Sequence, residues 1–141
     1  MARATRPLSI RRFEGLYYLG LGTGALNAWV LATSTDPQLR HVEPAGVLMD
    51  MALITALNLL LLWLIAYRGS NAARWVFTVL VALGALIMLA HISHALDYGE
   101  LSLALTLAQY LLCAIEILFL FRPDSRDWFA GRRPIDPDIF S

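Results

Sequence analysis

Four apolar blocks, each about 20 residues long, divide this 141-residue chain and restrict what it can fold into. They cover approximately residues 15–33, 46–67, 73–95 and 101–121, with a charged or turn-forming segment between each pair. An α-helix rises about 1.5 Å per residue, so each block matches a hydrocarbon core about 30 Å thick. Hydrophobic residues make up 58% of the chain and charged residues 16%, against roughly 45–50% and about 25% in soluble domains. We therefore expect one all-α domain, an integral membrane four-helix bundle.

The segments between the blocks predict an up-down antiparallel arrangement. Residues 68–71 (Arg-Gly-Ser-Asn) form a tight turn between the second and third blocks, because glycine and asparagine terminate helices readily. Helices joined by such short connections are antiparallel neighbours. The fourth block ends at Pro123, which cannot continue a helical hydrogen-bond ladder, and residues 122–141 are expected to form a short interfacial tail. The first block follows a basic lead, as in a signal peptide, but its apolar run is too long for one, so we expect a retained helix.

The arginines predict the orientation. The chain has no lysine, and ten of its eleven arginines lie in the N-terminal segment, the 68–74 turn and the tail after residue 121, whereas only Arg40 lies in the other two loops. Basic residues accumulate on the cytoplasmic side of a membrane. Both termini are therefore expected in the cytoplasm. Arginine without lysine is also typical of a GC-rich bacterial genome.

Polar residues on the fourth block form a stripe. They recur at intervals of four, three, four and three residues, which places them on one face of a helix: Ser102, Thr106, Gln109, Cys113 and Glu116. A packing seam between helices is the first interpretation, and the lining of a polar path or pocket is the second. Glu116 is costly to bury in a membrane, so we expect it to be protonated or paired with Arg68 or Arg74.

Small and polar residues also mark the first two blocks. Gly20 and Gly24 share one face of the first helix, continued by Asn27, and a glycine pair four apart allows two helices to approach closely. On the second block, Asp50 and Asn58 are eight residues apart and share a face. These residues predict helix packing on the first block and a candidate for ligand or proton binding on the second.

A further polar group is expected at the opposite end of the bundle. Asp50 begins the second block, while His91 and His94 end the third, so antiparallel packing brings them to a similar depth. Ordinary interfacial polarity is the first interpretation of these residues, and the second is that one carboxylate and two imidazoles bind a metal ion or relay a proton. We predict no metal and no cofactor. Haem in particular usually takes its two histidines from different helices.

Short motifs mark the ends of the blocks: Arg-Arg-Phe-Glu at 11–14, Ser-Asn-Ala-Ala-Arg-Trp at 70–75, Leu-Phe-Arg-Pro at 120–123 and Arg-Asp-Trp-Phe at 126–129. With these motifs the chain resembles a family of small, uncharacterised four-helix proteins of proteobacterial inner membranes. The resemblance implies an inner-membrane location and no particular activity. Four-helix drug exporters have a similar length, but their first-helix glutamate lies mid-helix, whereas Glu14 lies at the membrane edge.

Three functional hypotheses follow. The chain has no phosphate-binding glycine loop and no nucleophile beside a base, and its net charge of zero argues against nucleic-acid binding. The first hypothesis is a non-enzymatic accessory or scaffold protein in the bilayer, forming a homo-oligomer or joining a larger membrane complex. The second is a small transporter or a ligand- or proton-binding bundle that uses the candidate residues Glu116, Gln109, Asn58, Asp50, His91 and His94. A membrane enzyme is the third and weakest.

Overall fold

The computed structural model describes residues 6–33, 44–90 and 99–131, except the side chains of residues 44–48, 50 and 51. All regular structure in this part of the chain is helical, so the predicted all-α class is confirmed. The helices are α1 (Leu8–Ala32), α2 (Pro44–Ala66), α3 (Asn71–Ala90), α5 (Glu100–Leu120) and α6 (Pro123–Phe129).

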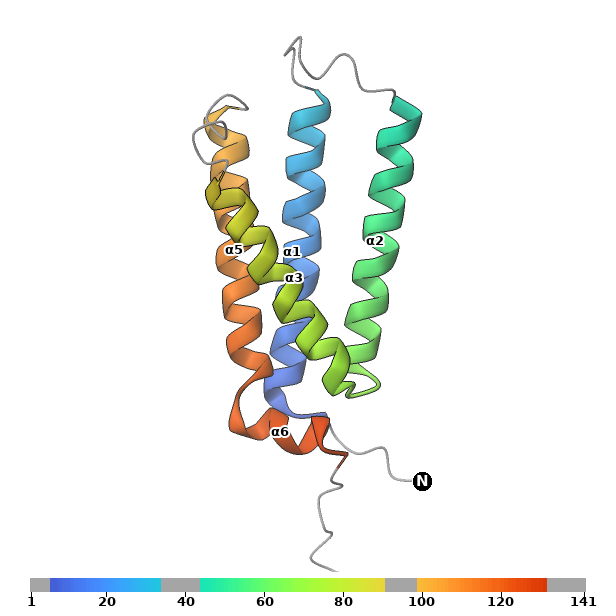
Figure 1. Ribbon diagram of the computed structural model, residues 1–141, viewed down its shortest axis with the longest axis vertical. Helices are drawn as coiled ribbons and strands as arrows, with labels where there is room; N and C mark the ends of the chain where they lie inside the picture. The colour runs from blue at the N-terminus through green and yellow to red at the C-terminus, as the bar shows by residue number, and fades with distance from the viewer. Residues whose placement is uncertain (1–5, 34–43, 91–98, 132–141) are drawn as a thin grey trace, which may run out of the picture.

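The four longer helices alternate in direction along the molecule (Figure 1). α1, α2 and α5 follow the long axis, and α3 crosses in front of them at an angle. The short helix α6 lies across one end, where α1 and α3 begin and where α2 and α5 finish. We call this the α6 end and the opposite one the far end.

α1 begins earlier than the apolar block that predicted it, at Leu8 instead of about residue 15. Its first turns are amphipathic, because Arg11 and Arg12 are exposed whereas Ile10 and Phe13 are buried. Apolar residues three to four apart fall on one helix face, so the charged segment packs against the molecule without burying its arginines.

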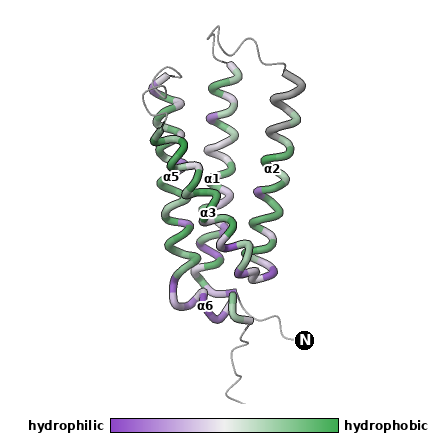
Figure 2. The backbone as a smooth tube through the Cα atoms, viewed as in Figure 1, coloured by the Kyte–Doolittle hydropathy of each residue, from purple (hydrophilic) through white to green (hydrophobic). Residues whose placement is uncertain are grey.

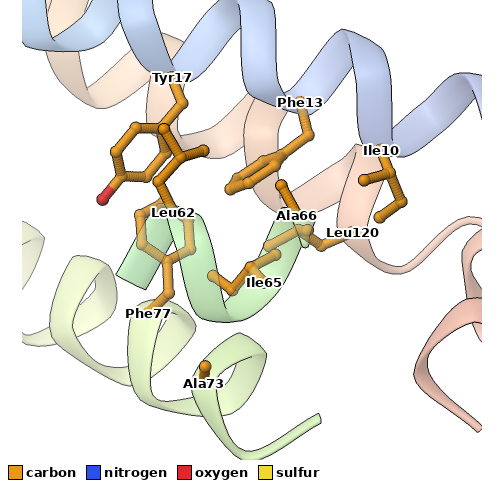
Figure 3. Packing of buried hydrophobic residues seen from close by; sticks show 9 residues of the cluster. All are labelled: Ile10, Phe13, Tyr17, Leu62, Ile65, Ala66, Ala73, Phe77 and Leu120. Carbon is orange, nitrogen blue, oxygen red and sulfur yellow. The ribbon is translucent and has the colours of Figure 1, made fainter. Parts of the chain in front are cut away.

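The buried apolar core gathers at the α6 end (Figure 3). Phe13, Tyr17 and Phe77 form its aromatic centre, with ring centroids 5.4–6.0 Å apart in tilted and edge-on arrangements, which aromatic rings favour over face-to-face stacking. α1, α2, α3 and α5 all contribute to this cluster, whose members are Ile10, Phe13, Tyr17, Leu62, Ile65, Ala66, Ala73, Phe77 and Leu120. The four helices are therefore held together mainly at this end.

The turn between α2 and α3 is closed by glycine, as the sequence predicts. Gly69 has a φ of +60°, a left-handed conformation in which a side chain is strained. A Cβ atom at this position would also lie 2.9 Å from the backbone oxygen of Trp128 on α6. Glycine thus serves both the turn and the close approach of α6.

Two of the described helices, α3 and α5, are long and apolar enough to cross a membrane. Apolar residues dominate both of them, whereas hydrophilic residues concentrate at the α6 end (Figure 2). Only a small share of either helix is buried inside the molecule, unlike the core helix of a soluble protein. Large apolar side chains are also exposed along α2, among them Leu53, Ile54 and Leu57.

Candidate functional site

The candidate site is a polar seam between α1 and α5. Within the described chain, α1 packs more extensively against α5 than against any other helix. The polar stripe of α5 faces the helix face of α1 that carries Gly20, Gly24 and Asn27. Two patterns that are separate in the sequence thus meet along one interface. We call this interface, formed by Gly20, Gly24, Asn27, Ser102, Thr106, Gln109, Cys113 and Glu116, the α1–α5 seam.

Toward the far end, the α1–α5 seam is held by hydrogen bonds. The Asn27 amide donates from Nδ2 to Thr106 Oγ1 over 3.1 Å, and its Oδ1 accepts a hydrogen bond from Ser102 Oγ over 2.9 Å. Thr106 Oγ1 in turn donates to the backbone oxygen of Ser102 over 2.8 Å. Both polar atoms of the asparagine amide are satisfied across the interface, which is favourable where water is scarce.

In the middle of the seam, the side chains of α5 lie directly against the backbone of α1. A Cβ atom built on Gly20 would be 3.1 Å from Gln109 Nε2 and 3.3 Å from Glu116 Oε1. At Gly24 it would be 3.9 Å from Gln109 Oε1, an ordinary contact. Gly20 is therefore the tight position of the pair. At this position the Gln109 amide and the Glu116 carboxyl group of α5 both lie close to the backbone of α1.

Asn58 on α2 is linked to this region by a hydrogen bond from Tyr17 on α1. The Tyr17 hydroxyl donates to Asn58 Oδ1 over 2.9 Å and lies 3.0 Å from the Asn58 backbone oxygen. The amide of Asn58 donates to the backbone oxygen of Ile54 over 2.8 Å. Tyr17 is almost completely buried, and its hydroxyl bridges α1 and α2.

Glu116 is only 2% exposed, and its pairing with Arg68 or Arg74 is not found in the structure. The one salt bridge among the described residues joins Arg6 and Glu14. Arg68 lies over the Trp63 ring at 5.3 Å, and Arg74 lies over the Phe121 ring at 4.5 Å. Both guanidinium groups therefore contact aromatic rings near the α6 end.

The group predicted at the far end cannot be assembled from the described residues. His91 and His94 lie outside them, as does the side chain of Asp50, although its backbone belongs to α2. Where side chains are described, no three histidine, cysteine, aspartate or glutamate residues gather in a geometry that could hold a metal ion.

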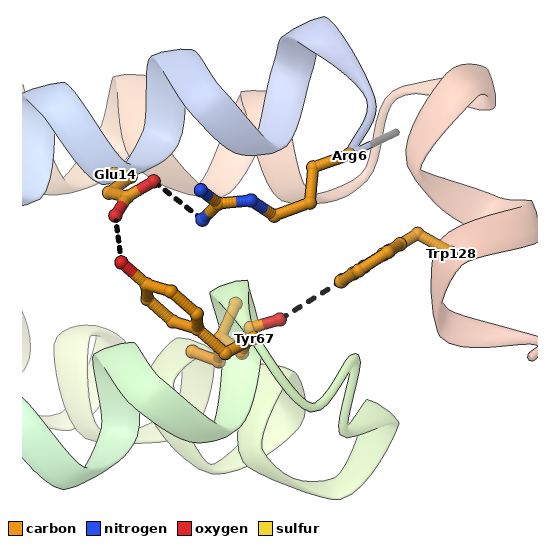
Figure 4. A network of polar contacts seen from close by, with 5 residues as sticks. Arg6, Glu14, Tyr67 and Trp128 are labelled. Carbon is orange, nitrogen blue, oxygen red and sulfur yellow. Dashed lines mark hydrogen bonds and ion pairs between the residues drawn. The ribbon is translucent and has the colours of Figure 1, made fainter. Parts of the chain in front are cut away.

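A second polar network ties the helices together at the α6 end (Figure 4). Arg6 Nη1 donates to Glu14 Oε2 over 2.9 Å, and the Tyr67 hydroxyl donates to Glu14 Oε1 over 2.7 Å. The Arg6 guanidinium also lies 4.6 Å from the centre of the Tyr67 ring. Tyr67 follows the last residue of α2, and its hydrogen bond to the Glu14 carboxylate raises the pKa of its phenol.

Helix α6 is attached by buried hydrogen bonds. Ser125, fully buried, has its Oγ 2.6 Å from Ser9 Oγ and donates to the Phe119 backbone oxygen over 2.9 Å. Trp128 Nε1 donates to the backbone oxygen of Ile65 over 3.2 Å (Figure 4). The sequence predicts only a short interfacial tail after residue 121. The first part of this tail forms helix α6, and the indole of Trp128 bonds to α2.

Sequence reasoning missed Tyr17 as a member of this region, although a signal was present. Tyr17 precedes Gly20 by three residues, and it extends the intervals of three and four that link Gly20, Gly24 and Asn27. The same periodicity would have placed its side chain on the interface. No comparable signal pairs Ser9 with Ser125, because their contact depends on the docking of α6.

Comparison of the chain with protein-family models, with curated proteins and with solved structures finds no match.

Proposed function

We propose that this chain is a four-span protein of a bacterial inner membrane, with both termini in the cytoplasm, and that it acts as a non-enzymatic scaffold or subunit. In this arrangement α1, α2, α3 and α5 cross the bilayer, and the α6 end faces the cytoplasm. The arginines that determine the orientation, Arg6, Arg68, Arg74 and Arg126 among them, belong to this end. The amphipathic first turns of α1 then lie at the interface.

The observation that carries the proposal is that the polar residues form hydrogen bonds between helices. Asn27, Ser102 and Thr106 hydrogen-bond to one another across two helices, and Asn58 accepts from Tyr17. These contacts use polar side chains as links between helices instead of leaving them to line a path. They also lie between α1 and its neighbours α2 and α5.

The exposed apolar faces of α2 and α3 favour a role in assembly. Residues 52–57 of α2 are exposed on all sides of the helix, so no other described element covers this part. Hydrocarbon or an apolar helix of another protein satisfies such a surface. A scaffold subunit presents apolar helix faces of this kind to its neighbours.

Site-specific photo-cross-linking in native membranes tests the scaffold role. A photoreactive residue at Ile54, which is 58% exposed, should attach to a protein, whereas one at the buried Leu62 of the same helix should not. Cross-links from position 54 to lipid alone, with no protein adduct, would contradict the proposal.

Reporter fusions test the topology separately. Fusions after Ser70 and after Arg133 should report the cytoplasm, and fusions after Asp36 and Tyr98 should report the opposite side. A C-terminus on the outside would mean that one of the four blocks does not cross the membrane.

A second candidate function, proton or ligand binding inside the bundle, has one observation in its favour. Glu116 is buried without an ion pair among the described residues, and Gln109 Oε1 beside it makes no hydrogen bond there. Proton flux into liposomes that contain the purified protein and a trapped pH-sensitive dye would test this function. A folded Glu116→Gln variant that loses a wild-type flux would favour it over the scaffold. Equal flux in the two proteins, or none, would remove it.

A further inference from the structure

A pocket of about 240 Å³ opens at the α6 end, apart from the α1–α5 seam. It lies between the start of α3 and the end of α6, and Asn71, Arg74, Arg126, Phe129 and Ala130 line it. Its volume is sufficient for a phosphate group and part of what the phosphate is attached to. Among the residues that the structure describes, this lining carries two positive charges and no negative one.

The Arg74 side chain is held in place by rings and not by hydrogen bonds. Its guanidinium lies 4.5 Å from the centre of the Phe121 ring and 4.7 Å from that of the Phe129 ring. Arg74 Nε is buried and has no hydrogen-bond partner in the described chain, and no salt bridge there includes Arg74. Cation–π contacts orient the group, and they leave its Nε–H without an acceptor among the described residues.

Arg126 adds a second charge to the same pocket. Both side chains belong to the lining of one pocket of about 240 Å³, so their positive charges repel each other. An anion bound between them would offset this repulsion.

The start of α3 adds a partial positive charge to those of the two arginines. Ser70 Oγ accepts a hydrogen bond from the backbone N–H of Ala73 over 3.2 Å. The N–H groups of Asn71 and Ala72, at the first positions of the helix, have no acceptor within it. The partial positive charge of a helix N-terminus favours an anion nearby. Asn71 itself lines the pocket, so this charge acts together with the two arginines.

We propose that the pocket lined by Arg74 and Arg126 binds a phosphate group. Guanidinium groups suit this anion, because their N–H donors match two phosphate oxygens at once. The phosphate could be the headgroup of an anionic lipid of the cytoplasmic leaflet, where basic pockets between membrane helices bind such headgroups. It could equally belong to inorganic phosphate or a small phosphate ester from the cytoplasm. The site does not depend on the scaffold role.

The experiment uses the full-length protein in phosphatidylcholine nanodiscs and has two arms. In the first, phosphatidylglycerol is added to the nanodiscs, and native mass spectrometry counts the lipids that stay bound. In the second, inorganic phosphate is titrated against the thermal unfolding midpoint, with chloride at the same ionic strength. Phosphatidylglycerol retention identifies a lipid headgroup, and a midpoint raised by phosphate alone identifies a soluble ligand.

Two variants and a matched control test whether binding depends on the arginines of the pocket. Arg126→Gln and Arg74→Gln should each weaken binding about fivefold, as expected for one basic residue near an anionic group. Arg126 is the safer change, since none of its described contacts supports the fold. Arg12→Gln removes an exposed arginine from the α6 end outside the pocket and should bind like the wild type.

Three results would overturn the proposal. The first is a wild-type protein that retains no phosphatidylglycerol and is not stabilised by phosphate. The second is a folded Arg126→Gln variant that binds as tightly as the wild type. The third is an equal loss in Arg12→Gln, because the effect would then come from the general positive charge of this end and not from the pocket.

Discussion

The α6 end and the far halves of α2 and α3 are equally helical but differ in what surrounds them. At the α6 end, four helices share one apolar cluster, and hydrogen bonds attach α6 to α1 and α2. Beyond it, residues 52–57 of α2 and much of α3 expose their apolar side chains. The difference shows that this chain uses its own contacts to fix α2 and α3 at the α6 end and leaves the apolar faces of their far halves to the surroundings.

The strongest test of this contrast is the same substitution at both places on α2. Ile65 is 0% exposed and Ile54 is 58% exposed. Ile65→Ala should lower the free energy of unfolding by about 2–5 kcal/mol, because it leaves a cavity in a packed cluster. Ile54→Ala should change it by less than about 0.5 kcal/mol. Denaturation in mixed micelles measures both, and an equal loss at position 54 would mean that the far half of α2 is packed within the protein.

A second test breaks the contact between α6 and the α2–α3 turn. Gly69→Ala should destabilise the protein by roughly 2–3 kcal/mol, since the left-handed conformation alone costs about 1–2 kcal/mol and the new Cβ meets the Trp128 backbone oxygen. Gly15→Ala on α1 is the control, because a Cβ there has open space. If the two variants melted at the same temperature, the turn would not hold α6.

A third test concerns the buried hydroxyl pair that attaches α6 to α1. Ser125→Ala should cost about 1–3 kcal/mol, because Ser9 Oγ and the Phe119 backbone oxygen lose a buried partner. Replacing both serines with alanine should cost less than the sum of the two single changes, because neither hydroxyl is left without the other. Additive losses in this double-mutant cycle would show that the two hydroxyls do not interact.

A smaller effect is expected in the α1–α5 seam. Gly20→Ala should cost about 1 kcal/mol, since its Cβ would press on Gln109 and Glu116. The cost should fall when Gln109→Ala is also present, because the closest atom is then gone. Gly22→Ala, with open space around its Cβ, should be tolerated. A Gly20→Ala variant as stable as Gly22→Ala would show that the seam is not tightly packed.

The smallest effect concerns pH and leaves the fold intact. The raised pKa of Tyr67 in the folded protein means that its contribution to stability is present below the ordinary tyrosine pKa. It is lost as the pH rises through the folded-state value, when the ionised phenol faces Glu14. NMR of ring-labelled tyrosine should show Tyr67 titrating above its usual range, and Glu14→Gln should lower that value. An unchanged titration in Glu14→Gln would show that the negative charge of the Glu14 carboxylate does not raise the pKa of Tyr67.

Apart from the early start of α1 and the short helix α6, the positions of the helices and the faces that they present were predictable from the sequence, because both depend on local periodicity. Intervals of three and four residues place Ser102, Gln109 and Glu116 on one side of α5 whatever lies opposite. The same rule places Gly20, Gly24 and Asn27 on one side of α1. The all-helical class follows from the same blocks of apolar residues.

Which faces meet was decided only by the tertiary structure. An apolar helix surface carries no information about its partner, so the sequence could not state that the stripe of α5 packs on the glycines of α1. Nor could it state that Arg74 lies over Phe121 and Phe129 instead of reaching Glu116. These contacts join residues that are distant in the chain, and close packing of specific shapes selects them, whereas periodicity acts only within one helix.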